Sequence, residues 1–126
     1  MIPYWYIPLV IAFVSICLYG YVRCKFNLKT DPMAFYFGIW DLDVWSLSHV
    51  LLFMYLAYQN KGRNNAIILV CVGIIWEIFE HMSGKKRPTW LGGCSFGANA
   101  HRKWWYGRYS DIFSNLLGII LGNYIK

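Results

Sequence analysis

The stretch AIILVCVGIIWEIFEHM, residues 66–82, decides how this chain is interpreted. Up to Trp76 it carries no charged side chain, as expected for a helix that crosses a lipid bilayer, whereas its last turns contain Glu77, Glu80 and His81. A charged side chain at the centre of a bilayer costs about 2.5 to 3.5 kcal/mol on insertion scales, so ionisable residues persist there mainly where they pair, contact water or serve a function. The stretch therefore predicts a membrane helix whose polar end pairs with other groups, contacts water or serves a function.

The composition of the whole chain also favours a membrane location. Of the 126 residues 58% are hydrophobic and only 14% are charged, compared with about 25% charged residues in a soluble domain. Three further stretches approach the ~20 apolar residues that a span needs, namely 2–22, 44–59 and 110–125. We expect the aromatic stretch 35–40 to lengthen the second span at its start. The predicted fold is all-α: one domain, residues 1–126, forming an integral membrane bundle of four transmembrane helices.

Basic residues predict the orientation of this bundle. The connections 23–43 and 84–109 carry nine Lys and Arg residues between them, whereas the opposite face receives only Lys61, Arg63 and Lys126. The positive-inside rule assigns the first face to the cytosol and the amino terminus to the non-cytosolic side. On this face Cys24 and Cys94 are expected to carry reduced thiols.

With this topology, polar residues of three helices fall at one level of the bilayer. Side chains three or four positions apart share a helical face, so Gly73, Glu77 and Glu80 form one stripe on the third helix, and Asp111 and Asn115 begin another on the fourth. The predicted polar set consists of His49, Glu77, Glu80, His81, Arg108, Asp111 and Asn115. Small residues let helix backbones approach closely. The predicted packing glycines are Gly73, Gly118 and Gly122.

The order of these residues resembles a known family. The run Trp76-Glu77-Ile78-Phe79-Glu80, preceded by His49, is similar to the pattern of VanZ-like small multi-pass membrane proteins. The last helix matches that pattern at Arg108, Asp111, Asn115, Gly118 and Gly122. The resemblance covers residues 41–125 and implies a small membrane protein of a family associated with glycopeptide tolerance. The segment 105–112 further resembles multi-pass proteins encoded by large DNA viruses of algae and protists, which implies the inner membrane of a virion as the setting.

Several roles for the polar set stay open. Glu77, Glu80 and Asp111 can form a structural knot between helices, with Arg108 or His49 as partner. Alternatively, His81, His49 and the acids offer imidazole and oxygen ligands for a divalent ion. A serine and histidine pair across helices, or binding of an amphiphile without chemistry, are further alternatives. The sequence contains no His-Glu-x-x-His or phosphate-loop motif, and we name no catalytic residue and expect neither a metal nor another cofactor.

The connection 84–109 combines basic and aromatic residues without a single acid. Such a segment should lie on a membrane surface, where each cation near anionic headgroups contributes about 1 kcal/mol. The predicted lipid or partner surface consists of Lys85, Lys86, Arg87, Arg102, Lys103, Trp104 and Trp105. Its expected partners are the bilayer, anionic lipid headgroups, and capsid or other membrane proteins, with nucleic acid disfavoured. The leading prediction is a non-enzymatic component of a viral internal membrane, and the alternative is a VanZ-like membrane enzyme or amphiphile-handling protein.

Overall fold

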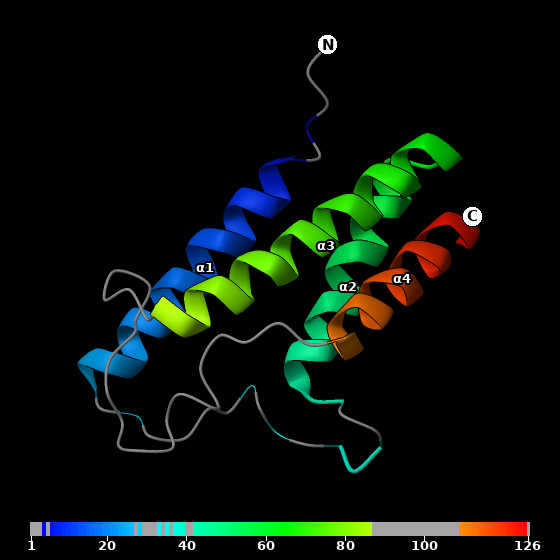
Figure 1. The fold of residues 1–126 in the computed structure, drawn as a ribbon. Coiled ribbons are helices and arrows are strands. Elements are labelled where there is room, and N and C mark those ends of the chain that lie inside the picture. The colour runs from blue at the N-terminus through cyan, green and yellow to red at the C-terminus, as the bar shows by residue number, and fades with distance from the viewer. Residues whose placement is uncertain are drawn as a thin grey trace.

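The computed structural model describes residues 4, 6–26, 28, 33, 35, 37–39, 42–86 and 109–125, with backbone only at 84–86. Regular secondary structure in these residues is entirely helical, with no strand (Figure 1). The four helices are α1 (Tyr6–Lys25), α2 (Val44–Gln59), α3 (Arg63–Lys86) and α4 (Tyr109–Tyr124). The all-α class is therefore confirmed for the described part of the chain. Most of the predicted loop 84–109 lies outside it, although α3 continues into the first residues of that loop.

The start of α2 is set by a capping interaction. Asp43 accepts a hydrogen bond from the Ser46 backbone N–H at 2.9 Å, and its own N–H donates to the Ser46 hydroxyl at 3.4 Å. This reciprocal capping box satisfies backbone donors that have no partner inside the helix. The expected extension of the helix into the preceding aromatic stretch is therefore wrong, since Phe35 and Phe37 lie outside any helix. The helix itself spans the predicted residues 44–59.

Two of the four helices are long and apolar enough to cross a membrane. These are α1 and the segment Arg63–Ser83 of α3. The other two, α2 and α4, have 16 residues each and are therefore about 24 Å long, which is shorter than the ~30 Å hydrocarbon core of a typical bilayer. The predicted membrane association is thus supported by two candidate spans, and the four-span topology stays a prediction.

The closest helix pair is formed by α2 and α4, which lie side by side in Figure 1. Their backbones meet at two glycines of α4. A Cβ added at Gly118 would lie 2.9 Å from the backbone N of Met54, and one added at Gly122 would lie 2.9 Å from that of Tyr58. The small hydrophobic core beside this contact consists of Phe53, Leu56, Ala57, Leu69 and Ile119. Glycine at both positions is what allows the two helices to approach so closely.

A short turn joins α2 to α3 at the end of the bundle opposite the polar residues. Gly62 has a φ of 126°, which disfavours residues with a Cβ. Its N–H donates to the Asn123 side-chain oxygen at 3.2 Å, and the Lys61 ammonium donates to the carbonyl of Ile125. These two bonds fix the end of α4 to the α2–α3 turn.

Aromatic rings attach α1 to the other helices. Phe13 contacts Trp76 of α3 edge-on, with ring centroids 6.1 Å apart, and Tyr19 contacts Trp45 of α2 at 5.4 Å. In Figure 1, α1 accordingly runs beside α3. The helix lies at the edge of the bundle (Figure 1).

One cysteine differs from expectation. Cys24 at the end of α1 is disulfide-bonded, whereas Cys17 and Cys71 are free. The expectation of a reduced thiol at Cys24 is therefore wrong. A stable disulfide is typical of an oxidising compartment, whereas the basic residues assign the same face to the cytosol. The orientation of the bundle stays a prediction.

Candidate functional site

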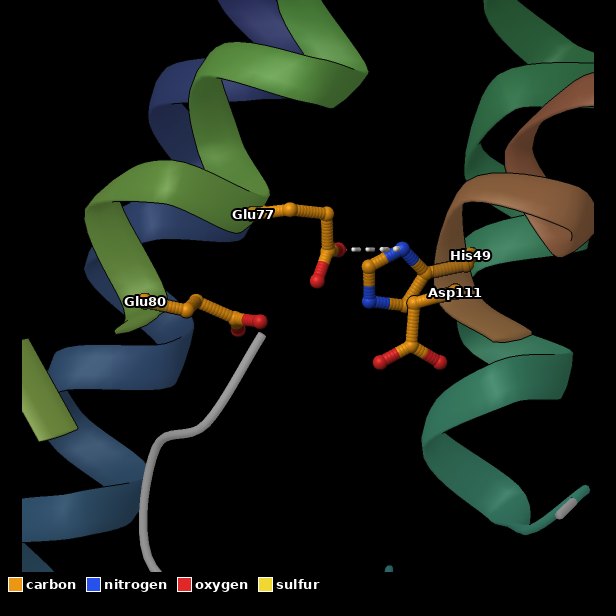
Figure 2. A group of neighbouring side chains, drawn as sticks. All are labelled: His49, Glu77, Glu80 and Asp111. Carbon is orange, nitrogen blue, oxygen red and sulfur yellow. Dashed lines mark ion pairs between the residues drawn. The ribbon is translucent and has the colours of Figure 1, made fainter. Parts of the chain in front are cut away.

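Three helices bring four ionisable side chains together. His49 comes from α2, Glu77 and Glu80 from α3, and Asp111 from α4, and one donor atom of each lies within 4.8 Å of those of the other three. Figure 2 shows the carboxylates and the imidazole turned toward a common point. We call these four residues the central cluster. All four belong to the polar set predicted from the sequence.

Local helix geometry explains why these side chains converge. The beginning of α2, the end of α3 and the beginning of α4 lie at the same end of the bundle (Figure 1). Glu77 and Glu80 are three positions apart and so share a face of α3, and Asp111 lies in the first turn of α4. Glu77 and Asp111 are only 5% and 3% exposed, so the cluster is largely shielded from the surroundings.

The His49 ring is held by a neighbour on α4. Its Nδ1 lies 2.8 Å from the Oδ1 of Asn115 and 3.9 Å from the Oε1 of Glu77. Because an amide oxygen only accepts hydrogen bonds, this contact is a hydrogen bond in the tautomer that carries its proton on Nδ1. The other ring nitrogen, Nε2, is turned in Figure 2 to the side where Glu80 and Asp111 lie. In the neutral ring this nitrogen has a lone pair that can bind a proton or a metal ion.

Asn115 itself is under an unusual constraint. The residue is 2% exposed, and its Nδ2 has no hydrogen-bond partner among the described residues. Nδ2 lies 2.7 Å from the place where a Cβ of residue 73 would stand, so only the glycine found there leaves room for this amide. A buried donor without a partner costs about 1 to 3 kcal/mol. The contact with His49 therefore orients the Asn115 amide, and in this orientation its Nδ2 has no hydrogen-bond acceptor among the described residues.

A serine at the start of α2 links the cap to the cluster. The hydroxyl of Ser46 lies 3.1 Å from Asp43 Oδ1 and 3.3 Å from Asp111 Oδ1, and Ser46 is 2% exposed. Neither Ser46 nor Asp43 belongs to the predicted polar set. The Asp-x-x-Ser spacing immediately before an apolar helix could have identified the cap, but it gives no indication of the contact with α4.

Other predicted residues are not brought into this site. The His81 side chain is exposed. Its spacing of four residues places it near Glu77 around the helix, but about 100° away from Glu80, so it lies at the border of the face that Glu77 and Glu80 share. Arg108 and the predicted lipid or partner surface have no described side chains. The roles predicted for Arg108 and for the lipid or partner surface therefore fall outside the described part of the chain.

Comparison of the chain with protein-family models, with curated proteins and with solved structures finds no match. The site is therefore interpreted from its residues and geometry. One imidazole with three carboxylates can join helices through hydrogen bonds and ion pairs, move a proton, or bind a cation.

Proposed function

We propose that this chain is a multi-pass integral membrane protein whose four helices all reach through the bilayer and are joined by the central cluster. The observation that carries the proposal is the inverted distribution of polarity. Among the described residues, more polar or charged side chains than hydrophobic ones are buried: Arg23, Asp43, Ser46, Glu77, Ser83, Asp111, Ser114 and Asn115. In water the hydrophobic effect favours the opposite arrangement.

The outer surface supports the same proposal. On α4, Phe113, Leu117 and Ile120 are 50% exposed or more, and on α3, Ile75 and Ile78 are 65% and 55% exposed. Soluble monomers rarely expose apolar patches larger than a few hundred Å², whereas hydrocarbon is a suitable environment for such a surface. The short helices α2 and α4 can still span if the bilayer thins locally or flanking side chains reach its interface.

In this proposal the role of the central cluster is to fix the helices in one arrangement. Hydrocarbon offers no hydrogen-bond partners, so polar side chains on α2, α3 and α4 are satisfied only when these helices meet. The protein is then a non-enzymatic membrane component, with the inner membrane of a virion as the setting that the resemblance at residues 105–112 implies. Kinship with VanZ-like proteins and an interaction of the basic loop with lipid headgroups or a neighbouring protein belong to the same proposal.

The topology can be tested by cysteine labelling. Leu28, between α1 and α2, and Asn64, at the start of α3, are exposed and should lie on opposite sides of the membrane. We expect a membrane-impermeant maleimide added to sealed vesicles to modify only one of the variants Leu28→Cys and Asn64→Cys. The second should react only after detergent is added.

The control is a background in which the two cysteines that are free among the described residues are replaced, Cys17→Ala and Cys71→Ala, with the disulfide-bonded Cys24 kept and no reductant added. This background should not react. Equal labelling of Leu28→Cys and Asn64→Cys before detergent would mean that α2 does not cross the bilayer, and the four-span proposal would fail.

A second candidate function is favoured by the composition of the site. An imidazole beside carboxylates is typical of general acid–base catalysis, and Glu77 lies 3.9 Å from the His49 ring. A membrane enzyme or an amphiphile-handling protein could use this pair. That candidate requires the negative charge of Glu77, whereas a cluster that only joins helices requires its shape and hydrogen bonding.

A further inference from the structure

We propose that the central cluster binds one divalent cation of the first transition row, with Mn²⁺ as the representative ion. The distances fit such an ion. Divalent ions bind oxygen and nitrogen ligands at about 2.0 to 2.6 Å, so two ligands on opposite sides of an ion are about 4 to 5 Å apart. The four donor atoms of the cluster lie within 4.8 Å of one another, so an ion placed among them needs only small side-chain movements to bind all four.

The ligand types narrow the choice of metal. Carboxylates suit Mg²⁺, Ca²⁺ and Mn²⁺, whereas imidazole suits Zn²⁺, Fe²⁺ and their neighbours. One histidine with three carboxylates combines both preferences and favours Mn²⁺ or Fe²⁺ over Ca²⁺. Di-iron and di-manganese helix bundles likewise project carboxylates and histidines inward from neighbouring helices. The central cluster offers ligands for a single ion.

A second, independent observation concerns the orientation of the histidine. Histidines that bind metals usually donate the N–H of their other nitrogen to an oxygen acceptor, which fixes the ring. His49 does this through Nδ1 and Asn115 Oδ1, at 2.8 Å. Asn115 is 2% exposed and keeps this orientation although its Nδ2 has no hydrogen-bond partner in the described structure. The ring is thus held with Nε2 available on the side of Glu80 and Asp111, where a ligand nitrogen is needed.

The ligand on α4 is oriented as well. The Ser46 hydroxyl lies within hydrogen-bonding distance of Asp111 Oδ1, at 3.3 Å. Hydrogen bonds to the ligands of a metal ion typically hold them in position for binding. This inference rests on the proposed function, because it makes the ion the means by which the central cluster joins α2, α3 and α4.

Metal binding can be measured on the full-length chain in detergent. After treatment with a chelator and its removal, we expect Mn²⁺ to bind at one ion per chain, detected by loss of the free Mn²⁺ signal in electron paramagnetic resonance. Mn²⁺ should also raise the melting temperature, since a ligand that binds only the folded state stabilises it. Elemental analysis of chain purified without added metal should find a first-row ion at the same ratio.

Two histidine variants provide the matched comparison. His49→Ala should weaken Mn²⁺ binding at least about 10-fold, whereas His81→Ala, next to Glu80 on α3 but exposed, should leave it unchanged. Asn115→Ala keeps all four ligands and should weaken binding by about 10- to 100-fold, as loss of a group that orients a ligand does. Glu80→Gln should abolish the rise in melting temperature while circular dichroism stays unchanged.

The outcomes separate this inference from the proposed function. A folded chain that binds no Mn²⁺, Fe²⁺ or Zn²⁺ would overturn the metal site, while a four-span labelling pattern would still support the membrane bundle. Equal effects of His49→Ala and His81→Ala would place the bound ion elsewhere and would also overturn it. Binding at one ion per chain together with a failed labelling test would refute the four-span topology and leave the metal site standing.

Discussion

Replacing Gly122 with leucine should destabilise the bundle by about 3 kcal/mol, the upper end of the range for overpacked cores. A Cβ at this position would lie 2.8 Å from the Ala57 Cβ and 2.9 Å from the Tyr58 backbone nitrogen. Backbone atoms of α2 cannot rotate away as a flexible side chain can, so the two helices would have to separate. Gly118→Leu should have a similar effect, because Met54 and Val50 of α2 approach it in the same way.

Thermal unfolding of the detergent-solubilised chain measures this effect. The control is Ile120→Leu, a change of similar chemistry on the outward face of α4, where the side chain is 53% exposed. It should change the melting temperature little. If all three variants melted together with the parent chain, the glycine face of α4 would not be the face that contacts α2.

Replacing Glu77 with leucine should cost about 1 to 3 kcal/mol of folding free energy, because it removes a buried hydrogen-bonding group and leaves its surroundings unsatisfied. Glu77 is 5% exposed and faces the His49 ring. Glu77→Gln keeps the shape of the side chain and an oxygen that accepts hydrogen bonds. We therefore expect its free energy of unfolding to lie within about 1 kcal/mol of that of the parent chain. Both variants should be unfolded in the presence of a chelator, so that no bound ion contributes to the comparison.

A functional assay on the same variants separates the two candidate functions. If the charge of Glu77 takes part in acid–base chemistry, Glu77→Gln should fold normally and yet fail in an assay such as virion yield or growth. The same failure in folded His49→Ala would then favour the membrane enzyme over the non-enzymatic component. Loss of stability in Glu77→Gln as large as in Glu77→Leu would instead contradict the view that shape and hydrogen bonding suffice.

The helices themselves were largely predictable from the sequence. Apolar stretches separated by charged connections predicted four of them, and α2 begins and ends where expected because Asp43 caps its start and Gly62 permits the turn after its end. The convergence of His49, Glu77, Glu80 and Asp111 was also predictable. It depends only on the spacing of residues along each helix and on the alternating direction of the helices.

Which helices contact one another could not be predicted in the same way. Helices that are apolar on most faces carry little information about their neighbours, so nothing in the sequence identifies α2 as the partner of the Gly118 and Gly122 face. The direction in which a side chain points around its helix is even harder to predict from the sequence. His81 follows Glu80 directly and yet lies on an exposed face, and the contact of Ser46 with Asp111 joins residues 65 positions apart.

That separation has a consequence for how the protein is made. The contacts of Ser46 with Asp111 and of His49 with Asn115 span 65 and 66 positions, so α2 leaves the ribosome well before α4 has been translated. At about 5 to 20 residues per second, this interval lasts roughly 3 to 13 seconds. During it the polar side chains of α2 must be accommodated by water, lipid headgroups or the insertion machinery. The hydrogen bonds from α2 to α4 can therefore form only after the last helix has been made, so completion of α4 is the step that closes this part of the bundle.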